Sequence, residues 1–473
     1  MAEDLGTPPG NGDPRRRLPS VTVLLESPRI QILIAEYSRP LAMDAVRAAL
    51  DGFRRDVATG SQTPSPDEVV REIKRRLLSE EKERLRPVVN ATGVILHTGL
   101  GRAALPRRAV DALASLNRCV NLEIDLGTGD RGKRNSMTES LLTRLTGAEA
   151  ALVVANNAAA TFLILAVFAA GKEVIISRGQ MIEIGGSFRL PDCIQQSGAT
   201  MVEVGTTNKT HLRDYENALT ENTAVILRCN PSNYRIVGFT QSVATAELAS
   251  LKKQRSFILV DDLGSGALVN LEAYGLPREP MVQDSVSAGA DLVCFSGDKL
   301  IGGPQAGVIV GRMELIARIK KHPLARMVRV GKLTNMALEQ TLRLFLTPET
   351  LVETNPTYRM LATPVANLKR RATRIQKEIV KRGVALNVAL EEAQSATGGG
   401  TLPATPIRTC VLAVACGAHS PDRLAALLRG NEPPIIPRVA GGKVLLDMRT
   451  LLKGDERIIV EALARIASSS AGE

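Results

Sequence analysis

Hydrophobic residues recur every three or four positions between residues 19 and 85, which is the spacing of amphipathic helices. The pattern is carried by "RIQILIAEYS", "AMDAVRAALDGFRRDV" and "SPDEVVREIKRRLLSEEKERL". Ser65 and Asp67 are candidate N-caps for the last segment, because short polar side chains accept hydrogen bonds from the free N–H groups of a first helical turn. We expect a helical module at residues 19–85, after a disordered leader at residues 1–18 that is rich in Pro, Gly and charge.

From residue 86 the pattern changes to short apolar runs that alternate with helical segments. Strands separated by helices are typical of a mostly parallel sheet with both faces covered, and such sheets bind ligands at the carboxyl ends of their strands. We therefore expect an α/β large domain at residues 86–350. Its predicted strands are 151–155, 173–177, 200–204, 224–229, 256–262, 291–296 and 306–311.

A basic amphipathic helix is predicted next, and it leads into a smaller α/β unit that ends in "KVLLDMRTL" and a final helix. We expect residues 351–473 to form this linking helix and a C-terminal small domain. The apolar face of the helix is predicted to carry Leu361, Val365, Leu368, Ala372, Ile375 and Ile379.

Length and composition narrow the class of protein. A chain of 473 residues is too long to fold around one compact hydrophobic core, and its 44% hydrophobic content is enough to fill two or three such cores. Six cysteines without a C-x-x-C pair and four scattered histidines indicate neither a disulfide framework nor a metal site. No run resembles a signal peptide or is long enough to span a bilayer. We expect a soluble cytoplasmic protein with no membrane partner.

The net charge of +11 is concentrated in one part of the chain. Residues 315–383 contain 15 Lys and Arg against 4 Asp and Glu, whereas residues 1–90 are nearly balanced, with 15 against 14. Clustered positive charge indicates a polyanionic partner or an anionic substrate. A solvated basic helix face is the alternative interpretation.

The loop in "LVCFSGDKLIGGPQAG" contains the first candidate for chemistry, Lys299. A confined ammonium has a lowered pKa, and its neutral amine can form a Schiff base with an aldehyde. The small residues around it would let a planar ligand approach the backbone. A lysine in a glycine-rich loop can also be an ordinary surface residue, so the hypothesis needs partner residues.

Two other predicted strand ends supply such partners. Asp261 and Asp262 close the strand in "SFILVDDLGSG", where one carboxylate could pair with the pyridinium nitrogen of pyridoxal phosphate. Asn156 and Asn157 lie between a strand and an apolar helix, and a helix N-terminus binds phosphate through its free N–H groups. The aspartates could instead cap a loop, and the two asparagines could be a plain helix N-cap. The combination of phosphate site, carboxylate and lysine favours a pyridoxal phosphate cofactor.

Arginines in glycine-rich or basic surroundings form the third candidate set. Arg102 lies in "NATGVILHTGLGRA", and Arg326 and Arg329 lie in "HPLARMVRVGK". A guanidinium matches an oxyanion with two parallel hydrogen bonds, so these residues could hold an anionic co-substrate. The alternative interpretation is that these arginines form ordinary ion pairs, which fits their spacing in the sequence equally well.

Several long blocks resemble one family, the bacterial selenocysteine synthases, or L-seryl-tRNA(Sec) selenium transferases. The resemblance covers about Leu18 to Leu452. It rests on "LPSVTVLLESPRIQILIAEYSR", "NATGVILHTGLGRA", "GGSFRLPD", "VEVGTTNKTHLRDYENAL", "DDLGSG", "SGDKLIGGPQAG" and "PPIIPRVAGGKVLLDMRTL".

This resemblance implies a fold-type-I pyridoxal-phosphate enzyme with an N-terminal tRNA-binding module, assembled as a ring of dimers, a homodecamer. The implied reaction converts seryl-tRNA(Sec) to selenocysteinyl-tRNA(Sec): water is lost to give an aminoacrylyl group, and selenium is added from selenophosphate. The implied site residues are the Schiff-base lysine Lys299, its acidic neighbour Asp298, Ser296 beside the cofactor, Arg102, Arg326 and Arg329 around selenophosphate, and Thr206 and Thr207 in the active site.

The chain departs from the family pattern at Gly99, Asn230 and Pro437, where Asn, His and a small residue are usual. These changes affect the expected geometry more than the reaction class. Two alternatives stay open. One is another pyridoxal-phosphate lyase acting on a free amino acid or sugar acid. The other is a nucleic-acid-binding protein with an inactive site.

Overall fold

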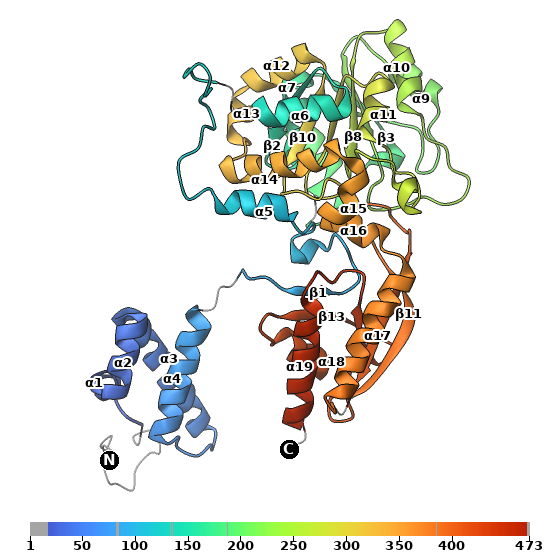
Figure 1. Cartoon of the computed structure of the whole chain (residues 1–473). Coiled ribbons are helices and arrows are strands. Elements are labelled where there is room, and N and C mark those ends of the chain that lie inside the picture. The colour runs from blue at the N-terminus through green and yellow to red at the C-terminus, as the bar shows by residue number, and fades with distance from the viewer. Residues whose placement is uncertain are drawn as a thin grey trace. The chain divides into compact units, whose positions relative to one another are not determined.

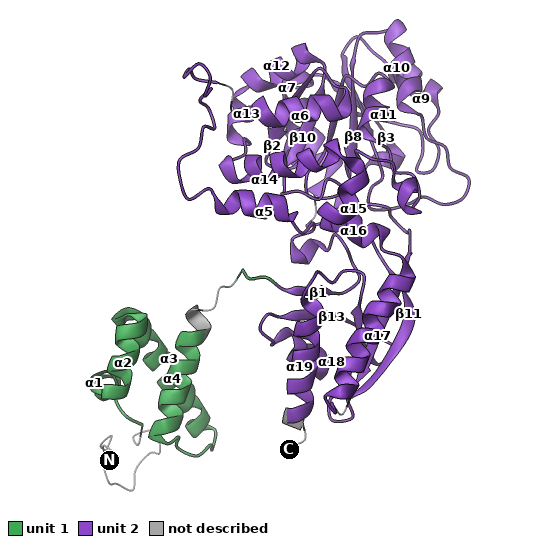
Figure 2. Cartoon of the chain, in the orientation of Figure 1, with its two compact units in different colours: residues 1–87 green, residues 88–473 purple. Residues whose placement is uncertain are grey.

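The computed structural model describes residues 18–81, 85–132, 134, 136–186, 188–384 and 386–470. The chain divides into two compact units, residues 1–87 and 88–473 (Figure 2). The predicted disordered leader lies outside the described residues, except for Leu18. In the described part of the chain, no helix combines the length and apolar character needed to cross a membrane.

The first unit is helical, as its periodicity predicts. Its core contains Leu24, Ile30, Leu50 and Ile73, all fully buried. The helices are α1 (Val21–Glu26), α2 (Pro28–Tyr37), α3 (Arg39–Ala58) and α4 (Pro66–Glu81).

Helix α4 begins with a capping box. The Glu68 N–H donates to the Ser65 hydroxyl at 3.3 Å, and the Ser65 N–H donates to the Glu68 carboxylate at 2.7 Å. The Ser65 cap is therefore confirmed. Asp67 lies inside the first turn instead, where it pairs with Arg29 of α2.

All seven predicted strands form one sheet in the second unit (Figure 1). Of these seven strands, β10 alone runs in the opposite direction to the others, so the prediction of a mostly parallel sheet is confirmed. The order across the sheet is β2 (Ala150–Val154), β10 (Gly307–Gly311), β9 (Leu292–Ser296), β8 (Ile258–Gly264), β7 (Thr223–Cys229), β3 (Glu173–Ser177) and β6 (Thr200–Val204).

Both faces of this sheet are covered, because alternate side chains of each strand enter different apolar clusters. In β2, Val153 joins one cluster and Leu152 joins the other. One cluster is completed by α6 (Ser136–Thr146), α11 (Val282–Ser287) and α14 (Lys332–Leu342). The other is completed by α7 (Asn157–Phe168), α8 (Leu190–Gln196) and α12 (Met313–Lys321).

A second sheet of five strands belongs to the C-terminal part of this unit. Its first strand comes from far upstream: β1 pairs in parallel with β13, and the other pairs are antiparallel. The start of the predicted large domain thus contributes to the small domain. The order is β1 (Val89–Ala91), β13 (Ile435–Ala440), β14 (Lys443–Asp447), β12 (Ile407–Ala415) and β11 (Asn387–Ser395).

The basic helix packs on this second sheet as α17 (Val365–Lys381). Leu368, Ala372, Ile375 and Ile379 are buried on one face, as predicted. Leu361 belongs to the preceding helix α16 (Pro356–Ala362), because Pro364 lies between the two helices and caps α17. Helices α18 (Pro421–Arg429) and α19 (Asp455–Ser470) complete the layer.

Shorter elements connect these layers. They are α5 (Arg107–Ala114), β4 (Glu183–Ile184), β5 (Phe188–Arg189), α9 (Leu212–Ala218), α10 (Thr245–Ser250), α13 (Pro323–Met327) and α15 (Leu351–Thr354).

Candidate active site

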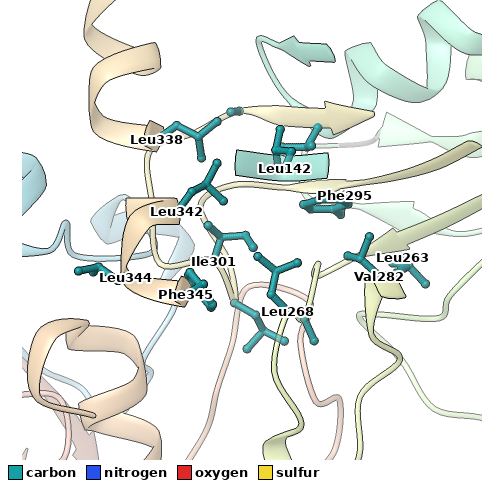
Figure 3. Close-up of a cluster of buried hydrophobic side chains, with 14 of the residues drawn as sticks. Leu142, Leu263, Leu268, Val282, Phe295, Ile301, Leu338, Leu342, Leu344 and Phe345 are labelled. Atoms are coloured by element: carbon teal, nitrogen blue, oxygen red, sulfur yellow. The ribbon is translucent and has the colours of Figure 1, made fainter. Parts of the chain in front are cut away.

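Lys299 lies in the loop between β9 and β10 and is only 5% exposed. The neighbouring residues Leu300 and Ile301 are fully buried, and Ile301 points into the apolar cluster with Phe295 and Leu342 (Figure 3). Gly302 has a φ of +69°, and a Cβ there would lie 2.5 Å from the Asn355 side-chain oxygen. The loop is therefore anchored directly after the lysine, by two buried apolar residues and by a glycine whose conformation and close contact exclude a side chain.

A cavity of about 220 Å³ opens beside Lys299 at the carboxyl ends of β8 and β9. This is the edge at which mostly parallel sheets bind ligands. Seven of the predicted site residues line it: Arg102, Asn156, Asn157, Asp262, Ser296, Asp298 and Lys299.

Of the two strand-end aspartates, only Asp262 lines this cavity. Its carboxylate accepts hydrogen bonds from the Asn157 amide at 2.7 Å and the Thr161 hydroxyl at 2.8 Å. Burial raises the pKa of Asp262, and these hydrogen bonds oppose the shift. Asp262 is thus held in place by helix α7.

Asp261 points to the opposite side of the sheet, because successive side chains of a strand alternate. It is completely buried and accepts hydrogen bonds from Arg228 at 2.7 Å and Thr245 at 2.9 Å. Its contacts are those of a structural ion pair.

Helix α7 begins at the cavity. The Asn156 side chain caps it by accepting a hydrogen bond from the Ala159 N–H at 2.8 Å, and the next residues, Asn157 and Ala158, line the cavity. Backbone N–H groups of a first turn lack partners within the helix, and the helix dipole adds positive potential. This end of the cavity suits a phosphate group.

Arg102 brings a guanidinium into the same cavity from the glycine-rich segment near residue 100. It donates to Asp298 at 2.7 Å, and both side chains are mostly buried. Its φ of +63° lies in the left-handed region, which is uncommon for a residue with a side chain. Such strained conformations concentrate at functional sites.

The environment of Lys299 lowers its pKa. Burial is the largest cause, and the Arg102 charge acts in the same direction. Asp262, Asp298 and Glu279 oppose it by favouring the ammonium. The result is an amine that is neutral, and so nucleophilic or basic, at a lower pH than an exposed lysine.

Besides Asp261, four predicted site residues do not line this cavity. Thr206 and Thr207 line a neighbouring cavity of about 390 Å³, which shares Asn230 with the first. Arg326 and Arg329 are exposed in and after α13, although Arg329 forms a β-bridge with Val154 at the end of β2. Their assignment to the substrate stays a prediction.

Sequence reasoning missed three residues near Lys299. Thr161 binds Asp262, Glu279 is buried and contributes to the field at Lys299, and Ser232 presents a buried hydroxyl at the cavity wall. Thr161 is one turn after Asn157, so helical spacing could have indicated it. Glu279 and Ser232 lie in irregular segments whose periodicity carries no such signal.

The cavity residues fit pyridoxal phosphate. An amine, a carboxylate and a helix N-terminus surround one space, and these groups match the aldehyde, the ring nitrogen and the phosphate of that cofactor. The Asn157 side-chain oxygen and the Arg102 Nε are buried and have no hydrogen-bond partner among the described residues. Buried polar atoms are normally paired, so a polar ligand is expected here.

Comparison with solved structures supports the fold. The chain is similar in fold to D-glucosaminate-6-phosphate ammonia-lyase, with a TM-score of 0.57 and 22% identity over 82% of this chain and 97% of that one. The architecture is the α/β fold of the fold-type-I pyridoxal-phosphate enzymes, as predicted.

Sequence comparison defines the family. A family model described as L-seryl-tRNA selenium transferase matches residues 88–452, and one described as selenocysteine synthase N terminal matches residues 15–54. The chain is 46% identical to the L-seryl-tRNA(Sec) selenium transferase of Moorella thermoacetica over 95% of this chain and 96% of that protein. It is also 46% identical to that of Hyphomonas neptunium, over 96% and 99%. The chain belongs to the L-seryl-tRNA selenium transferase family.

Proposed function

We propose that this protein is a pyridoxal-phosphate-dependent transferase that converts seryl-tRNA(Sec) to selenocysteinyl-tRNA(Sec) with selenium from selenophosphate. The family relation supports the substrate, since relatives with this name align with nearly the whole chain. The observation that carries the chemistry is the buried Lys299 with a lowered pKa, facing one cavity with Asp262 and the start of α7.

Three groups of this chain would hold the cofactor. Lys299 would bind it covalently, Asp262 would pair with its ring nitrogen, and the first turn of α7 at Asn157 would receive its phosphate, with Ser296 beside it. When bound, pyridoxal phosphate supplies an electron sink that stabilises negative charge at the seryl α-carbon.

Lys299 would also move the proton. Once the substrate amine has replaced it, its neutral Nζ would accept the proton of the seryl α-carbon, which its lowered pKa permits. The β-carbon to oxygen bond would then break, and the hydroxyl would take a proton from Lys299 Nζ and leave as water. Selenium from selenophosphate would add to the β-carbon, and a proton would return to the α-carbon through Lys299. Water would cleave the bond between selenium and phosphorus, so that phosphate is released.

Arg102 is the residue best suited to hold selenophosphate. Its guanidinium lines the cavity. One of its nitrogens binds Asp298, whereas its Nε has no hydrogen-bond partner within the residues that the structure describes. A guanidinium can donate to an oxyanion through two nitrogens. Arg326 and Arg329 are proposed to bind the same anion, and Thr206 and Thr207 to contact the substrate from the neighbouring cavity.

We further propose that the helical unit at the N-terminus and the basic segment 315–383 bind the tRNA, in a homodecamer. The basic segment includes exposed cations on α17, among them Arg374 and Lys377. Phosphate contacts of this kind dominate the affinity for nucleic acid.

A selenium-transfer assay tests the proposal. The purified protein is incubated with seryl-tRNA of the selenocysteine type or with ordinary seryl-tRNA, each with and without selenophosphate. We expect selenocysteinyl-tRNA only when the first tRNA and selenophosphate are both present. The Lys299→Ala variant should lose transfer and the visible absorbance of the bound cofactor, whereas Lys253→Ala, an exposed lysine on the same unit, should keep both.

Two outcomes would contradict the proposal. Reaction of free serine or a sugar acid without tRNA would indicate a lyase of small substrates. The purified protein could also bind tRNA but be colourless, with no cofactor fixed to it by borohydride reduction. That result would indicate a nucleic-acid-binding protein with an inactive site.

A further inference from the structure

A third cavity, of about 670 Å³, lies beside the C-terminal end of β11. We call it the triglycine cavity, because the segment around Gly398, Gly399 and Gly400 forms much of its wall. Other parts of the wall come from the chain near residue 93, from Ser232 and from Arg438 of β13. Ser232 also lines the cavity that contains Lys299, so the two spaces share a wall residue.

Buried hydroxyls without partners gather at this cavity. The side-chain oxygens of Ser232, Thr397 and Thr401 have no hydrogen-bond partner in the described part of the chain, although these residues are only 2%, 1% and 4% exposed. Arg438 Nε is also without a partner, while its other nitrogens face the Gln394 carbonyl at 3.0 Å and Asp447 at 3.8 Å. Since buried polar groups are normally paired, these atoms indicate a polar ligand.

The cavity comes close to the reacting lysine. A Cβ built on Gly400 would lie 3.5 Å from the Ser232 hydroxyl and 3.6 Å from Lys299 Nζ. A Cβ built on Gly264 would lie 3.1 Å from the same hydroxyl and 3.8 Å from the same amine. Ser232 and Lys299 therefore flank the same two glycines, and a substrate bound beside Lys299 can extend past Ser232 into the triglycine cavity.

The residues that line the triglycine cavity indicate which chemical groups of the substrate could bind there. Neutral hydroxyls are suited to the hydroxyl and ester oxygens of a sugar, and one guanidinium is suited to a phosphate. No Asp or Glu lines this cavity in the described part of the chain, so a phosphate would not meet a carboxylate at the wall. An aminoacyl-tRNA carries this arrangement next to its amino acid: an ester, a ribose and a phosphate.

We propose that the triglycine cavity binds the 3′-terminal nucleotide of the aminoacyl-tRNA. Ser232, which lies nearest Lys299, bonds to the ester, Thr397 and Thr401 bond to the ribose oxygens, and Arg438 pairs with the 5′-phosphate of that nucleotide. This assignment rests on the proposed function, because it takes the substrate to be a seryl group esterified to a tRNA.

Two stable analogues test it on the cofactor-loaded enzyme: 3′-serylamino-3′-deoxyadenosine with and without a 5′-phosphate. Binding is followed by the change in cofactor absorbance. We expect the phosphorylated analogue to bind more tightly, Thr397→Val and Thr401→Val each to weaken both analogues about tenfold, and Arg438→Met to remove the preference for the phosphate. L-serine methyl ester, which lacks the nucleoside, should be unaffected by all three variants.

Controls separate loss of the cavity from loss of the fold. Thr373→Val and Arg408→Met change the same residue types outside the cavities and should behave as the unaltered protein. Unchanged cofactor absorbance and melting temperature show that a variant is folded. If folded variants bind both analogues like the unaltered protein, the cavity holds only water and the assignment is wrong. If the unaltered protein fails to transfer selenium to seryl-tRNA, the proposed function fails instead.

Discussion

The two adjacent aspartates of β8 have different surroundings, and only Asp262 is placed to meet the proposed cofactor. Asp262 faces the cavity and is held by Asn157 and Thr161, whereas Asp261 is paired with Arg228 on the other face of the sheet. Identical side chains one position apart therefore have separate roles, because a strand sends successive residues to opposite faces.

Paired substitutions test this division of roles. Asp262→Asn should lower selenium transfer about 100-fold, since the amide cannot balance the charge of a protonated ring nitrogen, and should leave the melting temperature nearly unchanged. Asp261→Asn should keep the absorbance of the bound cofactor but lower the free energy of unfolding by about 3 kcal/mol, because Arg228 would lose its buried counter-charge. Transfer assays and thermal melting measure the two effects, and an exchange of the two phenotypes would contradict the assignment.

The lowered pKa of Lys299 predicts the pH dependence of cofactor loading. Only the neutral amine reacts with the aldehyde, so the loading rate of the cofactor-free protein should rise with pH and reach half its maximum below the ordinary lysine pKa. Arg102→Met removes a positive charge that lowers this pKa and leaves Asp298 unpaired, so its profile should shift to higher pH. Stopped-flow absorbance measures the rate, and a shift to lower pH would show that the Arg102 charge does not act on Lys299.

At the scale of elements, the site depends on where strands end and helices begin. Strand β9 ends at Ser296, β8 ends at Gly264 and α7 begins at Asn157, and these ends meet at one edge of the sheet. Apolar packing fixes the elements themselves, with alternate strand residues in two clusters. The polar residues beyond the strand ends are thereby gathered although they lie far apart in the sequence.

The capping box of α4 gives a prediction at this scale. Ser65→Ala removes the hydroxyl that accepts from the Glu68 N–H, and it should lower the local stability of α4 by about 1 kcal/mol. Hydrogen exchange of the α4 amides in the full-length protein measures this change. Ser61→Ala, in the preceding loop, is the matched control, and equal exchange in both variants would mean that the box contributes nothing.

At the scale of the whole molecule, the two compact units divide the charge unequally. The first unit is nearly neutral, whereas segment 315–383 of the second carries the excess of positive charge. If both bind tRNA, the first unit contributes mainly shape and specific contacts, and the second contributes most of the salt-dependent attraction.

This unequal division of charge predicts that changes in the two units impair tRNA binding in different ways. Deletion of residues 1–87 should weaken tRNA binding, retain the absorbance of the cofactor and leave the salt dependence of the remaining affinity nearly unchanged. The double variant Arg374→Glu and Lys377→Glu should lower the slope of log affinity against log salt by about 2, because two phosphates would no longer be neutralised. Filter binding over a series of salt concentrations measures both, and loss of cofactor absorbance on deletion would assign the first unit a structural role.

Much of the architecture could be predicted because it follows from local patterns. The seven strands, the helical first unit and the buried face of α17 all appear as hydrophobic periodicities in the sequence. The recruitment of β1 into the second sheet could not be predicted, since residues 89–91 pair with residues more than 340 positions away. Short strands that pair over such separations leave no local signal.

The sequence by itself determined the fold class and the family and predicted the reactive lysine, because hydrophobic period, long similar blocks and residue type are all properties of the linear chain. Only the tertiary structure decided that Asp262 and not Asp261 faces Lys299, that Arg102 enters the cavity while Arg326 and Arg329 stay exposed, and that Ser232 lies beside the lysine. Those facts depend on side-chain direction and on contacts between distant segments, which are fixed only when the strands pair and the two apolar clusters close.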